Sequence, residues 1–339
     1  MRILLVGDKN NGVHYHRLLI PYQRMLKTTD HEILTITTLE GEDKDGKETI
    51  ISVSEARQID VVVFNRNISF RFNPSPIFAT LKKAGVKIIM DVDDHWDISP
   101  GHPMYSYSRK TNFAGCCIDQ LRYSDYITCT HSHLRKQILD IGIPKEKVIV
   151  CKNAIDPDEL QYSQEFDYGD KLMWQGSSTH AMDLELLKEI EQPITLCGYH
   201  YSEEWFEMTS KIKQPLIKDH LPVTEYMNHY NGLGISLIPL KDNKFNRNKS
   251  ELKMIEAGWA KKGVIVSDIH PYSLLAKHGV NCFTAKSQSD FKKYTEMLIN
   301  EVNLQDDIRF RLHEEIRERY LIDKVNERRL EILWNCLKV

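Results

Sequence analysis

The chain has 339 residues, which is enough for two domains of ordinary size. Hydrophobic residues make up 41% and charged residues 27%, a balance that excludes a disordered or fibrous protein. With 45 basic and 48 acidic residues, the formal net charge is −3, so the composition does not favour a nucleic-acid partner.

The cysteine content and the length of the apolar runs further limit the class of protein to which this chain can belong. Seven cysteines, an odd number without a Cys-x-x-Cys pair, favour neither a disulfide framework nor a zinc ribbon. We therefore expect reduced, mostly buried thiols and a cytoplasmic protein. No apolar run approaches the ~20 residues of a transmembrane segment. The four apolar residues at 3–6 predict a first strand rather than a signal peptide.

The first half of the chain alternates short apolar runs with longer amphipathic stretches. The apolar runs predict strands at 3–6, 33–37, 60–64, 87–90, 126–129 and 148–151. Helical patterns occupy 15–27, 76–84 and 131–139. Strands that alternate with helices predict a parallel, doubly wound sheet.

The same alternation restarts after a polar, turn-rich segment at 156–169. Strand patterns follow at 172–174, 195–197, 234–238 and 264–267, and helical patterns at 182–190, 251–260 and 306–339. We therefore predict the α/β fold class, with two Rossmann-like doubly wound domains that face a cleft. The expected boundaries are 1–155 for the first domain, 156–169 for a linker, 170–320 for the second domain, and 321–339 for a C-terminal helix.

Loops that follow strands are where such sheets bind ligands. The first loop contains Gly12 and Arg17 at the start of a helical pattern, so its backbone N–H groups could bind an anion or a sugar. It lacks the Gly-x-Gly-x-x-Gly pattern of dinucleotide-binding proteins, and a plain strand-to-helix turn explains it equally well.

The second loop is acidic and follows the strand at 87–90. Asp91 and Asp93 form an Asp-x-Asp motif, and carboxylates bind divalent ions. Together with Asp94, they could instead contact an acceptor or a sugar, or form a solvated acidic turn. We favour contact with an acceptor or a sugar, without a metal site.

The third loop follows the strand at 172–174. Gly176 is followed by the hydroxyl residues Ser177, Ser178 and Thr179. Small hydroxyl side chains after a glycine suit a phosphate that is held by N–H and O–H donors. The same residues could equally cap the next helix.

The fourth loop is the most informative one. Lys249 and Ser250 precede a helical pattern, and Glu256 lies in its second turn. At a helix N-terminus the two residues would hold a diphosphate, because their charge and donors add to the positive end of the helix dipole. Glu256 could accept both hydroxyl groups of a ribose. A surface helix with i,i+4 charge pairs is the competing interpretation, and the apolar neighbours of Glu256 argue against it.

These segments together resemble the GT-B glycosyltransferases, in particular the large retaining group that uses sugar nucleotides (family 4-like, or glycosyl transferases group 1). The resemblance covers nearly the whole chain and implies that 1–155 is the acceptor domain, that 170–320 is the donor domain, and that the helix at 321–339 crosses back to the first domain. The segments that carry it are 3–6 with the Gly12 loop, 150–156, 174–176, 223–230, 234–240, 249–257, 263–268 and the tail.

The resemblance implies roles for individual residues. Glu256 matches the second acid of the family's Glu-x7-Glu pair, which contacts the nucleotide ribose, whereas Asn248 stands in place of the first acid. Asp93 and Asp94 stand where a histidine often follows the fourth strand, and with Lys249 they are the catalytic candidates. The residues assigned to the donor are Gly12, Arg17, Gly176, Ser177, Asn248, Ser250, Leu252, Lys253 and Glu256.

The implied reaction moves a sugar, with retention, from a nucleoside-diphosphate sugar (a UDP- or GDP-sugar) to an acceptor hydroxyl. Arg17, Lys249 or Lys253 would replace the family's paired Arg and Lys on the donor phosphates. No cofactor or metal is expected beyond the donor. The acceptor stays open: a saccharide, a lipid-linked sugar, a small molecule or, less favoured, a modified DNA base that meets the locally basic stretches at 131–136 and 241–253.

Three alternatives remain open. A metal-dependent GT-A-type transferase would use Asp91 and Asp93. A non-catalytic sugar-nucleotide-binding protein would explain why Asn248 replaces an acid. A sugar-nucleotide epimerase would consume the donor without any acceptor.

Overall fold

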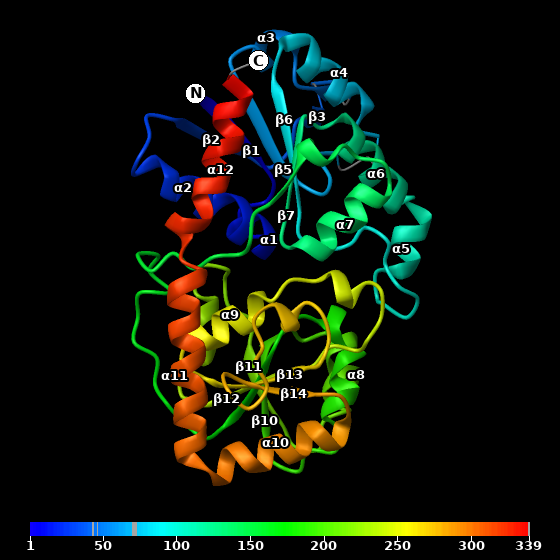
Figure 1. The fold of residues 1–339 in the computed structure, drawn as a ribbon. Helices are drawn as coiled ribbons and strands as arrows, with labels where there is room; N and C mark the ends of the chain where they lie inside the picture. The colour runs from blue at the N-terminus through cyan, green and yellow to red at the C-terminus, as the bar shows by residue number, and fades with distance from the viewer. Residues whose placement is uncertain (43, 46, 70–72, 338–339) are drawn as a thin grey trace. The chain divides into compact units, whose positions relative to one another are not determined.

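The computed structural model describes residues 1–42, 44–45, 47–69 and 73–337, and the chain divides into two compact units (Figure 1). The first unit consists of Met1–Ile98, Ser106–Asp156 and Ile322–Val339, and the second consists of Ser99–Tyr105 and Pro157–Leu321. Each unit contains one parallel six-stranded sheet, so the predicted class of two Rossmann-like α/β domains is confirmed.

The sheet of the first unit has the strand order β2-β1-β5-β6-β7-β8, and all its neighbouring strands are parallel. The strands are β1 (Arg2–Val6), β2 (Glu32–Ile36), β5 (Val61–Asn65), β6 (Lys87–Val92), β7 (Tyr126–Cys129) and β8 (Val148–Val150). Each coincides with an apolar run of the sequence. Parallel strands are covered on both faces, which is why these runs are apolar without a polar–apolar alternation.

Successive residues of β1 serve two different cores, because side chains alternate across a strand. Leu4 and Val6 belong to a core with α4 (Ser75–Ala84), α6 (Phe113–Tyr123) and α7 (Ser132–Asp140). Ile3 and Leu5 belong to a second core with α2 (Ile20–Leu26) and α12 (Ile322–Leu337). The remaining elements of this unit are α1 (Gly12–His14), a π-helix (Tyr15–Leu19), the hairpin β3 (Glu40–Glu42) and β4 (Glu48–Ile50), α3 (Val53–Ala56), α5 (Tyr105–Lys110) and a 3₁₀ turn (Lys145–Lys147).

The sheet of the second unit has the order β11-β10-β9-β12-β13-β14. Its strands are β9 (Leu172–Gln175), β10 (Ile194–Tyr199), β11 (Pro215–Asp219), β12 (Ile235–Ile238), β13 (Gly263–Ser267) and β14 (Phe283–Ala285). Its longer helices are α8 (Glu203–Thr209), α9 (Leu252–Trp259), α10 (Gln288–Asn300) and α11 (Val302–Arg319). The helix predicted over 182–190 is only a short 3₁₀ helix, Asp183–Leu187. Helices α9 and α11 pack on each other and on β13.

Three segments pack into one of the two units through specific side-chain contacts. Except for Asp156, the expected linker 156–169 lies in the second unit, where Tyr162 is buried and its carbonyl accepts the Trp259 indole N–H at 2.8 Å. The segment Ser99–Tyr105 also lies there, since the His102 ring packs against Phe245. Helix α12 lies in the first unit, and its Asp323 forms an ion pair with Arg24 at 2.7 Å.

Two further observations concern the whole chain. All seven cysteines are buried thiols, and burial raises the pKa of the Cys117 and Cys197 thiols to about 12. Both thiols therefore stay protonated at neutral pH. Among the described residues, no helix combines the length and the apolar composition that crossing a membrane requires.

Candidate functional site

The start of α9 lies directly after the loop that holds Lys249 and Ser250, and Leu252 is its first residue. Glu251 precedes the helix but does not cap it, because its buried carboxylate accepts the Tyr320 hydroxyl at 3.0 Å. The first N–H groups of a helix carry partial positive charge. The Lys249 ammonium, three residues earlier, adds to this charge, so the start of α9 favours an anion.

Lys253, in the first turn of α9, reaches the end of β9. Its Nζ lies 5.5 Å from the centroid of the Trp174 ring. A Cβ on Gly176 would lie 3.0 Å from that Nζ and 2.6 Å from the Trp174 ring, so a larger residue at 176 would displace both side chains. The predicted phosphate loops at 176–179 and 249–253 are therefore neighbours. Sequence analysis placed Gly176 and Lys253 in two separate loops and did not predict this contact.

Some polar groups of the loop after β9 already form hydrogen bonds within the protein. The Gly176 N–H donates to the Cys197 carbonyl at 3.3 Å. The hydroxyl oxygens of Ser177 and Thr179 lie 2.6 Å apart, and Ser177 is exposed. A ligand phosphate at this loop would therefore meet the Ser177 and Thr179 hydroxyls rather than the Gly176 N–H.

A histidine–aspartate pair that sequence analysis did not single out lies beside these lysines. His180 Nδ1 and Asp183 Oδ2 are 2.9 Å apart, and both side chains are largely buried. Burial, together with the charges of Lys253 and Lys249, lowers the pKa of His180 to about 3. The ring is therefore neutral, and it donates Nδ1–H to the carboxylate, which leaves Nε2 as an acceptor.

Asp183 also fixes the loop that leads to Lys249. Its Oδ1 accepts the Lys241 N–H at 2.8 Å and the Asn246 amide at 3.0 Å. Burial would raise the pKa of Asp183, but the bonds from His180 and Lys241 hold it below its usual value. One carboxylate thus ties the segment after β9 to the loop before α9. The only sequence signal for this role was the position of Asp183 next to the third loop.

Glu256 lies in the second turn of α9 and is 1% exposed. Burial raises the pKa of its carboxyl from 4.5 to about 8, while Lys253 acts in the opposite direction. The phenols of Tyr226 and Tyr230 have pKa values raised first by burial and then by the charge of Glu256. The sequence interpretation of a surface helix is therefore wrong for this face of α9, because Glu256 is buried.

Asn248 is buried immediately before Lys249. Its side-chain N–H donates to the Lys244 carbonyl at 2.8 Å, while its Oδ1 accepts no hydrogen bond from the residues that the structure describes. Buried acceptors without a donor are rare in folded proteins. A ligand hydroxyl or N–H group could supply the missing donor.

In the first unit, Arg17 does not present its charge to a ligand. Its guanidinium is 2% exposed and forms a bidentate ion pair with Asp91, with N–O distances of 2.7 and 3.0 Å. It also donates to the Cys151 carbonyl at 2.8 Å and to Asn153 at 3.1 Å. The expectation that Arg17 binds a donor phosphate is therefore corrected: burial and these partners give it a structural role.

The carboxylates of Asp91 and Asp93, which form the Asp-x-Asp motif, are both paired with arginines. Asp91 is buried, and its oxygens accept bonds from Arg17 and from the Thr128 hydroxyl at 2.5 Å. Asp93 pairs with Arg66 at 3.0 Å. Among the described residues, no three or more His, Cys, Asp or Glu side chains are grouped so that they could hold a metal ion.

Asp93 and Asp94 follow the carboxyl end of β6, as predicted. Burial raises the pKa of Asp93, and Asp94 and Asp91 add to the rise, against the opposing charge of Arg66. His95 is buried next to them; its ring stacks on Trp96 and its Nδ1 accepts the Asp97 N–H at 2.9 Å. The acidic turn is thus mostly buried rather than solvated.

Gly12 is the first residue of α1, and the Asn11 side chain caps this helix. A Cβ on Gly12 would meet no atom of the described chain within 4 Å. Packing therefore does not require glycine here, and the role of Gly12 at a donor stays a prediction.

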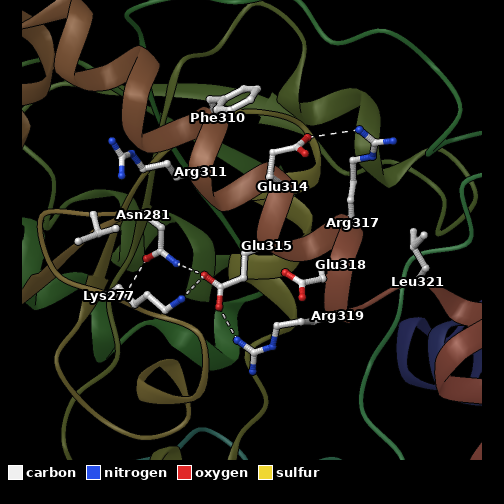
Figure 2. A pocket seen from close by; sticks show the side chains of 11 residues that line it. Lys277, Asn281, Phe310, Arg311, Glu314, Glu315, Arg317, Glu318, Arg319 and Leu321 are labelled. Carbon is white, nitrogen blue, oxygen red and sulfur yellow. Dashed lines mark hydrogen bonds and ion pairs between the residues drawn. The ribbon is translucent and has the colours of Figure 1, made fainter.

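A cavity of about 920 Å³ lies along α11, apart from the loops described above (Figure 2). Its central carboxylate, Glu315, accepts bonds from Lys277 and Asn281 at 2.9 Å and from Arg319. Figure 2 also shows Glu314 paired with Arg317. These charges satisfy one another, so we interpret the cavity wall as a stabilising network.

Comparisons with known proteins identify the fold. No family model matches the chain, and no curated protein matches it. HepE from Anabaena, solved in complex with UDP and glucose, is similar at a TM-score of 0.66 and 13% identity, over 99% of this chain and 100% of that chain. Sucrose-phosphate synthase from Thermosynechococcus elongatus gives 0.67 and 9% identity, over 99% of both chains. A glycosyltransferase from Rickettsia africae gives 0.64 and 12%, over 99% and 98%.

These likenesses extend over nearly the full length of each pair of chains, at identities of 9 to 13%. At such identities, the likeness shows the fold alone. The chain therefore has the two-domain GT-B fold, the fold of glycosyltransferases.

Proposed function

We propose that this protein transfers a sugar from a nucleoside-diphosphate sugar to an acceptor hydroxyl. The observation that carries the proposal is the approach of Lys253 to Gly176, which joins two loops with phosphate-binding chemistry at the start of α9. Lys249, Lys253 and the helix N-terminus concentrate positive charge there. A diphosphate is the natural ligand for such a site.

The ribose of the nucleotide would lie against Glu256. A buried carboxylate with a raised pKa is favoured in its ionised form only when donors reach it. Two ribose hydroxyls supply such donors. The Oδ1 of Asn248, which accepts no hydrogen bond from the described residues, would accept one further donor from the ligand.

In the proposed reaction, the bond between the anomeric carbon and the diphosphate oxygen breaks, and the acceptor oxygen forms the new bond. Lys249 and Lys253 would stabilise the negative charge that develops on the leaving diphosphate. The acceptor hydroxyl loses its proton, and Asp93 or Asp94 is the proposed proton acceptor, since burial moves the pKa of Asp93 toward neutral pH. Gly12, Ser177, Ser250 and Leu252 are proposed to contact the donor through backbone or hydroxyl groups.

The finer features of the reaction come from the family resemblance. We propose retention of configuration and a UDP- or GDP-sugar donor, with no metal requirement because basic residues act on the diphosphate. HepE, which shares the fold, was solved with UDP, and this supports UDP as the first nucleotide to test.

The test is a thermal-shift screen of the full chain against UDP, GDP, ADP and CMP, with and without EDTA. A ligand that binds only the folded protein raises the melting temperature. We expect a clear shift for one nucleoside diphosphate that EDTA does not remove. The matched sugar nucleotide is then offered with saccharide acceptors. Binding without release of the nucleoside diphosphate would indicate a non-catalytic binding protein, and release without any acceptor would indicate hydrolysis or epimerisation.

A further inference from the structure

The segment Ser99–Tyr105 packs in the second unit, although the residues before and after it, up to Ile98 and from Ser106, belong to the first unit. We call this segment the strap. It begins a few residues after Asp94, one of the two candidates for the proton acceptor. Its contacts in the second unit hold the chain in this excursion, and those contacts lie at the candidate donor site.

The strap contacts the loop that precedes α9. The His102 ring packs against the Phe245 ring with the centroids 5.0 Å apart and an interplanar angle of 66°. The Ser99 hydroxyl donates to the side-chain oxygen of Asn243 at 3.4 Å. The same oxygen accepts the Asn246 N–H at 2.9 Å. Both contacts of the strap therefore fall on the turn that shapes this loop.

Phe245 connects the strap to the charge that would hold the diphosphate. Its side chain is buried, and Lys249 Nζ lies 4.8 Å from the centroid of its ring. An ammonium group near the face of an aromatic ring is attracted by the electrons of the ring. His102 and Lys249 thus contact the same ring. If the His102 ring is lost, Phe245 can move, and the preferred position of the ammonium moves with it.

Two features of the strap hold His102 in this position. His102 Nδ1 accepts the Met104 N–H at 3.1 Å, which fixes the ring on its own turn. Gly101 has a φ of +84°, a conformation that residues with a side chain rarely adopt. A Cβ on Gly101 would lie 2.9 Å from Met182 Sδ, and Met182 directly precedes Asp183. The strap therefore approaches both the segment after β9 and the loop before α9.

We propose that the strap regulates the affinity of the second unit for a diphosphate, and that His102 is a positioning residue that acts on Lys249 through Phe245. The packed strap orders the loop at 241–250, so a ligand has less ordering left to impose. By linkage, a bound diphosphate in turn stabilises the packed strap. The effect on nucleotide affinity rests on the proposed function, whereas the ordering of the loop by the strap does not.

Two substitutions of His102 separate its ring from its hydrogen bond. His102→Phe keeps an aromatic ring on Phe245, whereas His102→Asn keeps a side-chain acceptor for the Met104 N–H but removes the ring. We expect His102→Asn to raise the Kd for UDP about twofold to tenfold, the range that an aromatic pair contributes, and His102→Phe to bind as the wild type does. The matched control is Met104→Ala, since this side chain is 40% exposed and the backbone N–H bond is kept. An unchanged Kd in His102→Asn, or an equal loss in His102→Phe, would contradict the role of the ring.

Uridine distinguishes the positioning of Lys249 from a general loosening of the second unit. It has the base and the ribose of UDP but no phosphate, so it cannot report on the position of the lysine ammonium. We expect His102→Asn to bind uridine as the wild type does, as measured by NMR titration of the full chain. If the loss of affinity is as large for uridine as for UDP, the substitution disturbs the whole site and the positioning role is overturned.

Hydrogen exchange tests the strap with and without a nucleotide, and it separates this inference from the proposed function. Without a nucleotide, we expect faster exchange over 241–250 in His102→Asn than in the wild type or His102→Phe. Added UDP should slow exchange over 99–105 in the wild type. If UDP binds but exchange over 241–250 is the same in all three proteins, the inference fails and the proposed function stands. If exchange depends on the His102 ring while no nucleotide binds, the strap orders the loop, and the proposed function fails together with the regulatory role.

Discussion

The guanidinium of Arg17 and the carboxylate of Asp91 form a buried bidentate ion pair, with N–O distances of 2.7 and 3.0 Å. The pair joins the helical segment after β1 to the end of β6, and the Thr128 hydroxyl of β7 and the Asn65 side-chain amide of β5 also donate to the carboxylate. Both charges are compensated within the first unit. Two charged residues that follow predicted strands, where the sequence analysis searched for ligand-binding groups, therefore stabilise the fold instead.

Replacement of Arg17 should destabilise the protein rather than weaken nucleotide binding. We expect Arg17→Met to lower the free energy of unfolding by about 3–5 kcal/mol, because it leaves Asp91 buried without its partner. Urea unfolding measures this change, and a UDP titration below the midpoint should give an unchanged Kd. The control is Arg122→Ala, which removes an exposed ion pair and should cost at most about 1 kcal/mol. Weaker UDP binding with unchanged stability would indicate that Arg17 contacts the donor and would contradict its structural role.

The two lysines at the start of α9 should each contribute to diphosphate binding. We expect Lys249→Ala and Lys253→Ala each to raise the Kd for UDP about tenfold to a hundredfold, because a hydrogen bond to a charged group contributes roughly 1.5–3 kcal/mol. Isothermal titration calorimetry measures this change. Lys293→Ala, on the exposed side of α10, is the matched control and should bind UDP normally. Equal affinities in all three variants would contradict the assignment.

Donor binding should strengthen as the pH rises toward 8.5. Ribose hydroxyls bind the ionised form of Glu256, whose pKa of about 8 leaves only about a tenth of it ionised at pH 7. The Kd for UDP-glucose, whose diphosphate charge is constant over this range, should fall up to about tenfold between pH 7 and 8.5. In Glu256→Gln the profile should be flat. A wild-type profile that is equally flat would remove Glu256 from the donor site.

The same carboxyl should make the unliganded fold less stable as the pH rises. The folded-state pKa is raised, from 4.5 to about 8, so the folded protein holds a proton that the unfolded chain releases. Stability is therefore unaffected by Glu256 below about pH 4.5 and decreases between pH 4.5 and 8. Comparison of urea unfolding for the wild type and Glu256→Gln at pH 5 and pH 8 isolates this contribution. A difference that does not grow with pH would mean that Glu256 titrates normally.

Asp183 should control the order of the loop that carries Lys249. In Asp183→Asn, one amide oxygen must replace the carboxylate toward the Lys241 N–H, the Asn246 amide and His180. We expect faster hydrogen exchange over 241–250 and a Kd for UDP raised at least fivefold. His180→Ala should weaken UDP binding less and leave exchange over 241–250 unchanged. Unchanged exchange in Asp183→Asn would show that the loop is ordered without this carboxylate.

Most strands of the two six-stranded sheets were predictable, because a buried parallel strand appears in the sequence as a short apolar run. Strands β11 and β14 were not predicted. Strand β14 (Phe283–Ala285) has only three residues, and in β11 (Pro215–Asp219) Leu216 and Ile217 are exposed and polar residues follow them. The hairpin β3–β4 was missed for the same reason, as most of its residues are exposed. The helix expected over 182–190 is limited to a 3₁₀ turn, where Asp183 bonds to residues far along the chain rather than to its own helix.

The candidate site was predictable in residue types but not in pairings. The fourth loop was found from the order of Lys249, Ser250 and Glu256, which reflects local helix chemistry. The structural role of Arg17 depends on its ion pair with Asp91, which lies 74 positions away in the sequence. No local sequence pattern predicts that contact. The same is true of the packing of His102 on Phe245, which brings Ser99–Tyr105 into the second unit. Long-range partners decide whether a charged residue binds a ligand or the protein itself.

The most direct test of the central claim is calorimetric titration of UDP and GDP into the purified full chain in the presence of EDTA. The account predicts binding of one nucleoside diphosphate at one site per chain, lost in the double variant Lys249→Ala/Lys253→Ala and kept in Lys293→Ala. Absence of binding by either nucleotide, or binding that the double variant retains in full, would contradict it.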